Sequence, residues 1–86
     1  MDIDPRRLRY LLAVARAGGV LAAADELHMT PSAVSQQITR LERETGRVLM
    51  TRTTHGSALT PEGHTLAEAA QQIERTLAAV QLRLEH

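Results

Sequence analysis

The 86-residue sequence contains no cysteine, no lysine, no phenylalanine and no tryptophan. The absence of cysteine excludes a disulfide framework and any thiolate metal site. Because Tyr10 is the only aromatic residue, a hydrophobic core has to be built from aliphatic side chains and alanine. This composition favours helices packed through small and aliphatic side chains over a β-sandwich, whose strands need more aromatic and β-branched residues. We therefore expect a mainly α-helical protein, and the length allows one small domain.

The sequence also lacks an apolar run long enough to span a bilayer, and no signal-peptide core follows the charged N-terminus. These absences predict a cytoplasmic protein with no membrane partner. The four histidines have no spacing that places two on one helical turn, so we expect no metal and no other cofactor. Local signatures of a serine hydrolase and of a glycine-rich phosphate loop are missing too, and the sequence does not predict an enzyme.

An excess of charge of either sign is missing as well, since ten arginines balance ten acidic residues. DNA-binding domains usually carry a positive excess, because neutralising phosphates supplies most of their sequence-independent affinity. A neutral total therefore argues against a nucleic-acid partner unless the arginines gather on one surface. It would suit a protein-interaction module, which is the alternative function.

Cap-and-proline pairs mark the starts of helices at Asp4-Pro5, Thr30-Pro31 and Thr60-Pro61. The first helix is expected to end at Gly18-Gly19, and a short second helix to run from about Val20 to Leu27. We expect the first helix to bury one set of residues and to expose its arginines: Leu8, Leu11, Leu12 and Ala15 inward, Arg6, Arg7, Arg9 and Arg16 outward.

The third helix is predicted from Pro31 to about Thr45, and with the second helix it forms a helix-turn-helix layout. One side of it is aliphatic and should be buried: Val34, Ile38 and Leu41. The other side carries hydroxyl, amide and guanidinium groups: Ser32, Gln36, Thr39 and Arg43, flanked by Ser35 and Arg40. Such groups read base edges and hold phosphates in a major groove, although an ordinary solvated face is the alternative. Serine and threonine lower helix propensity, so they are an unusual choice for a merely solvated face.

Two short apolar runs, Val48–Met50 and Ala58–Leu59, follow the third helix. The polar stretch Thr51–Ser57 separates them, which predicts a β-hairpin with Arg52 and His55 on or near its tip. A hairpin in this place is the wing of a winged helix.

The last helix is predicted from Pro61 to about Glu85. Its apolar residues alternate at spacings of four and three: Leu66, Ala70, Ile73, Leu77, Val80 and Leu84. This is a heptad seam, and a helix of about 25 residues, nearly 40 Å long, would outreach so small a domain. Its first turns should pack on the domain itself, and we interpret the seam as a homodimer contact. The final Leu84-Glu85-His86 is either a native helix end or the start of a vector-derived histidine tag.

With these elements in register, the sequence resembles the LysR-type transcriptional regulators along essentially its whole length without gaps. The matching residues are Ala22-Ala23-Ala24, Leu27, Ser32 to Ile38, Leu41-Glu42, Gly46, Leu49, Arg52 and Leu59 to Gly63. The resemblance implies a winged helix-turn-helix over residues 1–60 and a linker and dimerisation helix over 61–86. It also implies an effector-binding domain for a small molecule, which is absent from this chain.

By the same resemblance, a homodimer binds duplex DNA at an imperfect inverted repeat. The third helix enters the major groove and the wing lies along the minor groove. The residues that match the family's DNA-contacting positions are Pro31, Ser32, Ser35 and Gln36 on the helix, Thr30, Gln37 and Arg40 nearer the backbone, and Arg52 at the wing base.

The sequence departs from the family's pattern near the second helix and in the wing. Gly19 and Leu21 stand where a serine or threonine is usual, and Val20 and Met50 replace aromatic residues. The wing has His55 where relatives are rich in arginine or lysine. Each missing phosphate contact reduces by about one unit the magnitude of the slope of the logarithm of the binding constant against the logarithm of salt concentration. We therefore expect weaker DNA binding than in a relative with a basic wing.

Overall fold

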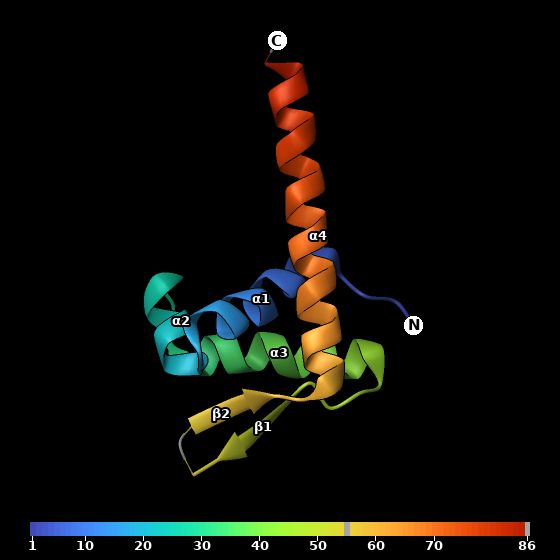
Figure 1. Ribbon diagram of the computed structural model, residues 1–86. Helices are drawn as coiled ribbons and strands as arrows, with labels where there is room; N and C mark the ends of the chain where they lie inside the picture. The colour runs from blue at the N-terminus through green and yellow to red at the C-terminus, as the bar shows by residue number, and fades with distance from the viewer. Residues whose placement is uncertain (55, 86) are drawn as a thin grey trace.

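The structure is a computed structural model that describes residues 1–54 and 56–85. Its elements are, in order, a 3-10 turn η1 (Pro5–Arg7), α1 (Leu8–Ala17), α2 (Val20–Glu26), α3 (Pro31–Thr45), β1 (Met50–Thr53), β2 (Gly56–Leu59) and α4 (Pro61–Leu84). Helices α1, α2 and α3 pack into a body with the hairpin beside it, and α4 rises from this body to the C-terminus (Figure 1). The prediction of a mainly α-helical winged helix-turn-helix with a long last helix is confirmed.

The predicted caps start the two longest helices. The Thr30 hydroxyl accepts a hydrogen bond from the backbone N–H of Ala33 at 3.0 Å, and the Thr60 hydroxyl accepts one from Gly63 at 3.0 Å. A proline follows each cap in the first turn, where a backbone N–H has no partner within the helix. The sequence signal and the observed helix starts therefore agree.

Asp4 starts η1 with both its side chain and its charge. Its carboxylate accepts hydrogen bonds from the Arg6 guanidinium and from the Arg6 backbone N–H, both at 3.0 Å. The side-chain bond first, and then the backbone bond, hold the pKa of Asp4 below its ordinary value of 3.8. At the other ends, Gly18 and Gly46 terminate α1 and α3 with left-handed φ angles of 88° and 68°.

The hydrophobic core lies between α1, α2 and α3 and contains no aromatic side chain among its fully buried members. Its largest fully buried side chains are Leu11, Val34, Ile38, Leu41 and Leu49. Helix α2 contributes Ala23 and Ala24, both buried, and these small residues allow α2 to approach its neighbours closely. The aliphatic stripe predicted on α3 is therefore the centre of the core.

Two details of α1 differ from prediction. Ala15 is exposed and Val14 is buried instead, because Ala15 faces a hollow between α1 and α4 rather than a packed surface. Arg7, predicted to face solvent, is half-buried and turns toward α3. Both differences depend on how α4 and α3 lie against α1, which the periodicity of one helix does not contain.

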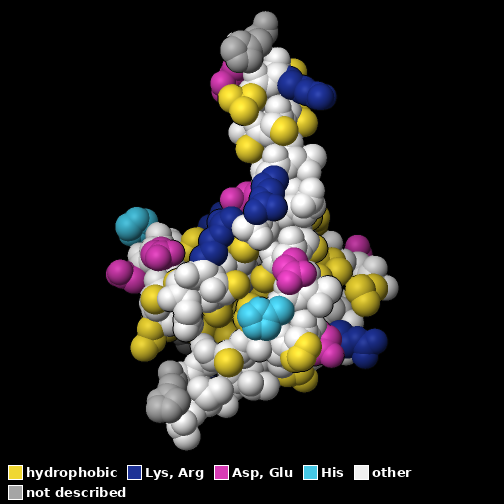
Figure 2. Space-filling view, in the orientation of Figure 1, with side chains coloured by type: hydrophobic (Ala, Val, Ile, Leu, Met, Phe, Trp, Pro, Cys, Tyr) yellow, Lys and Arg dark blue, Asp and Glu magenta, His cyan; other side chains and the backbone are white. Residues whose placement is uncertain are grey.

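The first turns of α4 belong to the body, and the rest of the helix projects from it. Gly63, Ala67 and Ala70 are buried, and Leu66 packs partly against the core. The prediction that Leu66 and Ala70 lie in a dimer seam is therefore corrected: both contribute to the domain's own packing. Beyond Gln71 the helix is exposed, with hydrophobic side chains along the projecting part (Figure 2).

The strands of the hairpin differ from prediction: the first starts two residues later, at Met50, and the second starts two residues earlier, at Gly56. Strands β1 and β2 are antiparallel, with Met50 opposite Leu59 and Thr53 opposite Gly56. Of the predicted first strand only Met50 is in β1, since Leu49 is fully buried in the preceding connection. Most of β1 consists of residues predicted to be loop, because threonine is β-branched and favours strands even where both faces meet solvent.

Candidate nucleic-acid interface

The outward side of α3 is polar and open. Four residues on it fall within roughly 60° of one another at 100° per residue, and all four are exposed: Ser32, Gln36, Thr39 and Arg43. They lie opposite the buried aliphatic stripe. We call this set the outward face of α3. The division of the helix into two faces is as predicted.

The other residues predicted on this part of α3 extend the outward face at its edges. Thr30, Pro31 and Arg40 are exposed, and Ser35 is half-buried. The Thr39 hydroxyl donates a hydrogen bond to the Ser35 carbonyl at 3.0 Å, so its proton is used within the helix. Thr39 therefore offers a ligand mainly its acceptor lone pairs.

Gln37 is separated from this set. Its Oε1 accepts a hydrogen bond at 3.3 Å from Nε of Arg7, which also forms an ion pair with Glu44. Asp4 lies 3.7 Å from the same guanidinium. Gln37 thus belongs to a network that joins η1 to α3, and its predicted contact with DNA stays a prediction.

The two acidic residues of α3 are both engaged inside the molecule. Glu44 pairs with Arg7, while Oε2 of Glu42 accepts hydrogen bonds from the backbone N–H groups of Leu49 at 2.8 Å and Met50 at 3.4 Å. Arg43 lies between these two carboxylates in the sequence, where it could pair with either of them. Both are bound elsewhere, so the Arg43 charge stays on the outward face.

The neutral total charge is unevenly distributed along the chain. Between residues 30 and 60 the sequence contains no other acid than these two glutamates, and it contains four arginines: Arg40, Arg43, Arg47 and Arg52. All four are exposed. An excess of exposed arginines over acids in one segment favours polyanions there even when the whole chain is neutral. The argument from neutrality against a nucleic-acid partner is therefore weaker for this segment.

The wing carries little charge of its own. Arg52 on β1 is exposed and pairs in register with Ser57, and it is the only Asp, Glu, Lys or Arg between residues 50 and 59. On the side shown in Figure 2 the hairpin surface is mostly neutral and polar. His55, predicted near the wing tip, lies outside the described residues. The wing thus offers one fixed cation and several hydroxyl groups.

Several residues that place the wing were missed by sequence reasoning. Besides Glu42, Thr60 fixes the connection to β1: its hydroxyl donates to the Val48 carbonyl at 2.7 Å and its N–H donates to the Leu49 carbonyl at 3.0 Å. The Ser57 hydroxyl accepts from the Val20 N–H at 3.3 Å. Thr60 was identified only as a helix cap, and nothing local in the sequence marks its second contact.

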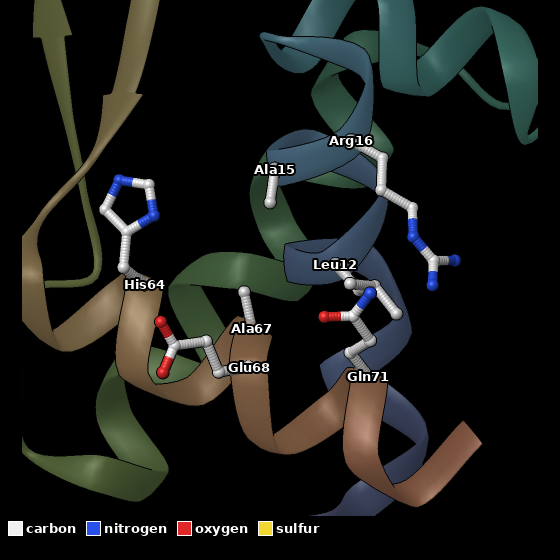
Figure 3. Close-up of a pocket in the computed structure, with 7 residues that line it drawn as sticks. All are labelled: Leu12, Ala15, Arg16, His64, Ala67, Glu68 and Gln71. Carbon is white, nitrogen blue, oxygen red and sulfur yellow. The ribbon is translucent and has the colours of Figure 1, made fainter. Parts of the chain in front are cut away.

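A second surface feature lies between α1 and α4 (Figure 3). It is a hollow of about 170 Å³ lined by Leu12, Ala15, Arg16, His64, Ala67, Glu68 and Gln71. Its rim mixes a cation, an acid and an imidazole, so it has no consistent charge with which to select a ligand. In the part of the chain that the structure describes, no group of three His, Asp or Glu is placed to hold a metal ion. Within the same residues, no helix combines the length and the apolar character that a membrane span requires.

Comparison with known proteins connects the outward face and the wing to one family. The sequence profile described as "Bacterial regulatory helix-turn-helix protein, lysR family" matches residues 5–64, more than half of the chain. The chain belongs to the LysR family. Within this family it is 41% identical over 68 residues to the HTH-type transcriptional regulator TcbR of Pseudomonas sp. strain P51, a match that covers 79% of the chain and 23% of TcbR.

Solved structures of LysR-family proteins have the same fold. Full-length LysG from Corynebacterium glutamicum superposes with a TM-score of 0.88 at 33% identity, covering 98% of this chain and 29% of LysG. The CbnR DBD–DNA complex superposes with a TM-score of 0.84 at 35% identity, covering 96% of this chain and 95% of that one. The chain therefore corresponds in extent to the DNA-complexed CbnR fragment and to less than a third of the full-length relatives.

Proposed function

We propose that this LysR-family chain is the DNA-binding part of a transcription regulator, with α3 in the major groove of duplex DNA and the wing at the adjacent minor groove. The observation that carries the proposal is the outward face of α3, where hydrogen-bonding side chains stand among arginines whose neighbouring acids are bound elsewhere. The likeness to a CbnR fragment solved with DNA supports it. The function is placement on DNA, and no bond is made or broken.

Within this proposal the side chains divide into two roles. Gln36 and Ser35 read bases, with Ser32 and Pro31 beside them, since glutamine can pair bidentately with adenine and serine accepts several geometries. A second group fixes the register through the phosphates: Thr30, Arg40 and Arg52. Gln37 is left out of both groups and serves instead to orient α3 through Arg7.

We further propose that two copies pair through the projecting part of α4. Ile73, Leu77, Val80 and Leu84 are 44%, 58%, 42% and 81% exposed, and they follow one another along a single side of the helix. An apolar stripe of this length is costly to leave in water, and a second copy of the same helix complements it. A two-fold dimer would bind an imperfect inverted repeat, because its symmetry matches that of such a site.

The part of this chain that aligns with relatives makes up 23% of TcbR and 26% of the CbbR regulator of Sinorhizobium medicae. We propose that control by a small-molecule effector needs residues outside this chain. We propose that the protein acts in the bacterial cytoplasm, where the chromosomal DNA is.

The proposal is tested by titrating labelled DNA from upstream of the protein's own gene at two salt concentrations. The logarithm of the binding constant should fall with the logarithm of salt by about 0.9 per phosphate neutralised. Gln36→Ala should weaken specific binding by about 5- to 150-fold, because a bidentate base contact discriminates by about 1–3 kcal/mol. Binding to unrelated DNA should change little.

Gln72→Ala is the matched control, since it removes an exposed glutamine from α4 rather than from α3. If Gln36→Ala changed neither the specific nor the non-specific DNA affinity, the assignment of the outward face of α3 as the base-reading face would be refuted. Absence of any salt-sensitive DNA binding by the wild-type chain would refute the function and favour a protein-docking module.

A further inference from the structure

The first turn of α2 is capped by a residue of the wing. Helix α2 starts at Val20, and its N-cap residue, Gly19, has no side chain with which to accept a hydrogen bond. The N–H groups of a first helical turn have no acceptor within the helix. The hydroxyl of Ser57, 37 residues further along the chain, accepts the hydrogen bond from the Val20 N–H at 3.3 Å.

The same serine is directed inward from the hairpin. Along β2 the exposure alternates, so that Ser57 is half-buried while Gly56 and Ala58 are exposed. Ser57 is also the direct partner of Arg52 across the antiparallel pair. Directly opposite residues in such a pair share one face of the sheet, so a tether at Ser57 limits the movement of Arg52 as well.

We propose that Ser57 is a positioning residue for DNA binding: by capping α2 it fixes the angle of the wing to the helix-turn-helix and so the place of Arg52. Arg52 matters here because the wing, residues 50–59, contains no other arginine and no lysine, aspartate or glutamate. A wing that swings would have to be ordered on binding, and that ordering would reduce affinity. The inference rests on the proposed function of the wing at the minor groove.

The position of Gly19 allows capping and wing placement to be separated. Its φ of 164° is extended backbone that any residue adopts, and an added β-carbon would meet nothing within 4 Å. A serine at residue 19 can therefore cap α2 locally. Gly19→Ser should accept from the Leu21 or Ala22 N–H and so offset the helix stability that Ser57→Ala removes, without restoring the link between α2 and the wing.

The first measurement is made on the free protein. Hydrogen exchange of the Val20 amide, followed by NMR, should be about 2- to 10-fold faster in Ser57→Ala than in wild type, the factor expected for one ordinary hydrogen bond. Ser57→Thr keeps a hydroxyl and should restore slow exchange. Unchanged exchange in Ser57→Ala would overturn the proposal about Ser57, whether or not the wild-type chain binds DNA. Failure of the wild-type chain to bind DNA would refute only the proposed function.

The second measurement is DNA affinity. Ser57→Ala should weaken binding by about 2- to 10-fold, whereas in an Arg52→Ala background it should add little, because the group that it positions is gone. The double variant Gly19→Ser/Ser57→Ala should regain the wild-type melting temperature and keep the weakened DNA binding. Full additivity of Ser57→Ala with Arg52→Ala, or recovery of affinity with Gly19→Ser, would show that Ser57 is a helix cap only and would overturn the proposal.

Discussion

The α-carbon of Gly63 lies so close to the backbone carbonyl of Leu49 that a β-carbon on residue 63 would be 2.1 Å from the carbonyl oxygen. This contact is where α4 crosses the connection between α3 and the wing. The same carbonyl accepts the Thr60 N–H, so the chain entering the wing and the chain leaving it are held together at one point. The base of the wing therefore depends on the absence of a side chain at residue 63.

Gly63→Ala should destabilise the protein. In an ordinary exposed helical site the change would gain about 1 kcal/mol, since alanine is the better helix former. Here the new methyl group meets backbone atoms, and overpacking costs about 1–3 kcal/mol or more. Urea unfolding monitored by circular dichroism measures the change, with Gln72→Ala on the same helix as control. An increase in stability would contradict the close approach.

Glu42→Ala should also destabilise the fold, through the backbone of the wing connection. It leaves the N–H groups of Leu49 and Met50 without the carboxylate that accepts them, and a lost hydrogen bond to a charged group costs about 1.5–3 kcal/mol. The change is measured as the shift of the urea midpoint. Glu68→Ala, which removes an exposed acid from α4, should shift it by less than a third as much; equal shifts would count against the role of Glu42.

How far the sequence predicts the fold can be judged from particular elements. The cap-and-proline pairs locate the helix starts, because an N-cap acts on amides only two or three residues away. The two faces of α3 are equally local, since they follow from 3.6 residues per turn. In both cases the information lies within a few residues of the feature that it specifies.

Most of the differences between prediction and structure depend on partners distant in sequence. Leu66 and Ala70 continue the heptad seam without a break, and only the position of α1 shows that they are covered by their own domain. Gln37 looks like its neighbour Gln36 until Arg7 is placed beside it. Strand β1 is exposed beyond Met50 and shows no alternating burial, so the apolar run Val48–Met50 was interpreted as the strand although Leu49 lies in the connection before it.

The Arg7–Glu44 pair gives a further prediction about α3. Both side chains are largely covered, with 23% and 21% of their surface exposed. Arg7→Met would leave the Glu44 carboxylate with one partner fewer and release Gln37, and we expect a loss of about 1–3 kcal/mol in unfolding free energy. Arg6→Met is the matched control, because Arg6 is 89% exposed and its pair with Asp4 lies in solvent.

A double-mutant cycle shows whether Arg7 acts through Glu44. If it does, Arg7→Met should cost less in a Glu44→Gln background, with a coupling free energy between about 0.5 and 3 kcal/mol. Additive losses would place the effect of Arg7 elsewhere, in its contacts with Asp4 or Gln37.

The last prediction concerns the projecting half of α4, where two leucines of nearly equal exposure allow a matched comparison. Leu77 is 58% exposed and lies in line with Ile73 and Val80, whereas Leu82 is 60% exposed and lies about 140° away around the helix. If two copies pair through the seam, Leu77→Glu places a carboxylate between the helices twice, once from each copy. It also removes the burial of a leucine, worth about 1.5–3 kcal/mol in each copy. Sedimentation velocity should therefore find Leu77→Glu monomeric at concentrations where wild type and Leu82→Glu are dimeric.

DNA binding by Leu77→Glu should fall more on a full inverted repeat than on a half-site, because only the full site gains from two linked copies. A dimeric Leu77→Glu protein, or equal dissociation of both variants, would mean that the apolar stripe on α4 is covered by something other than a second copy.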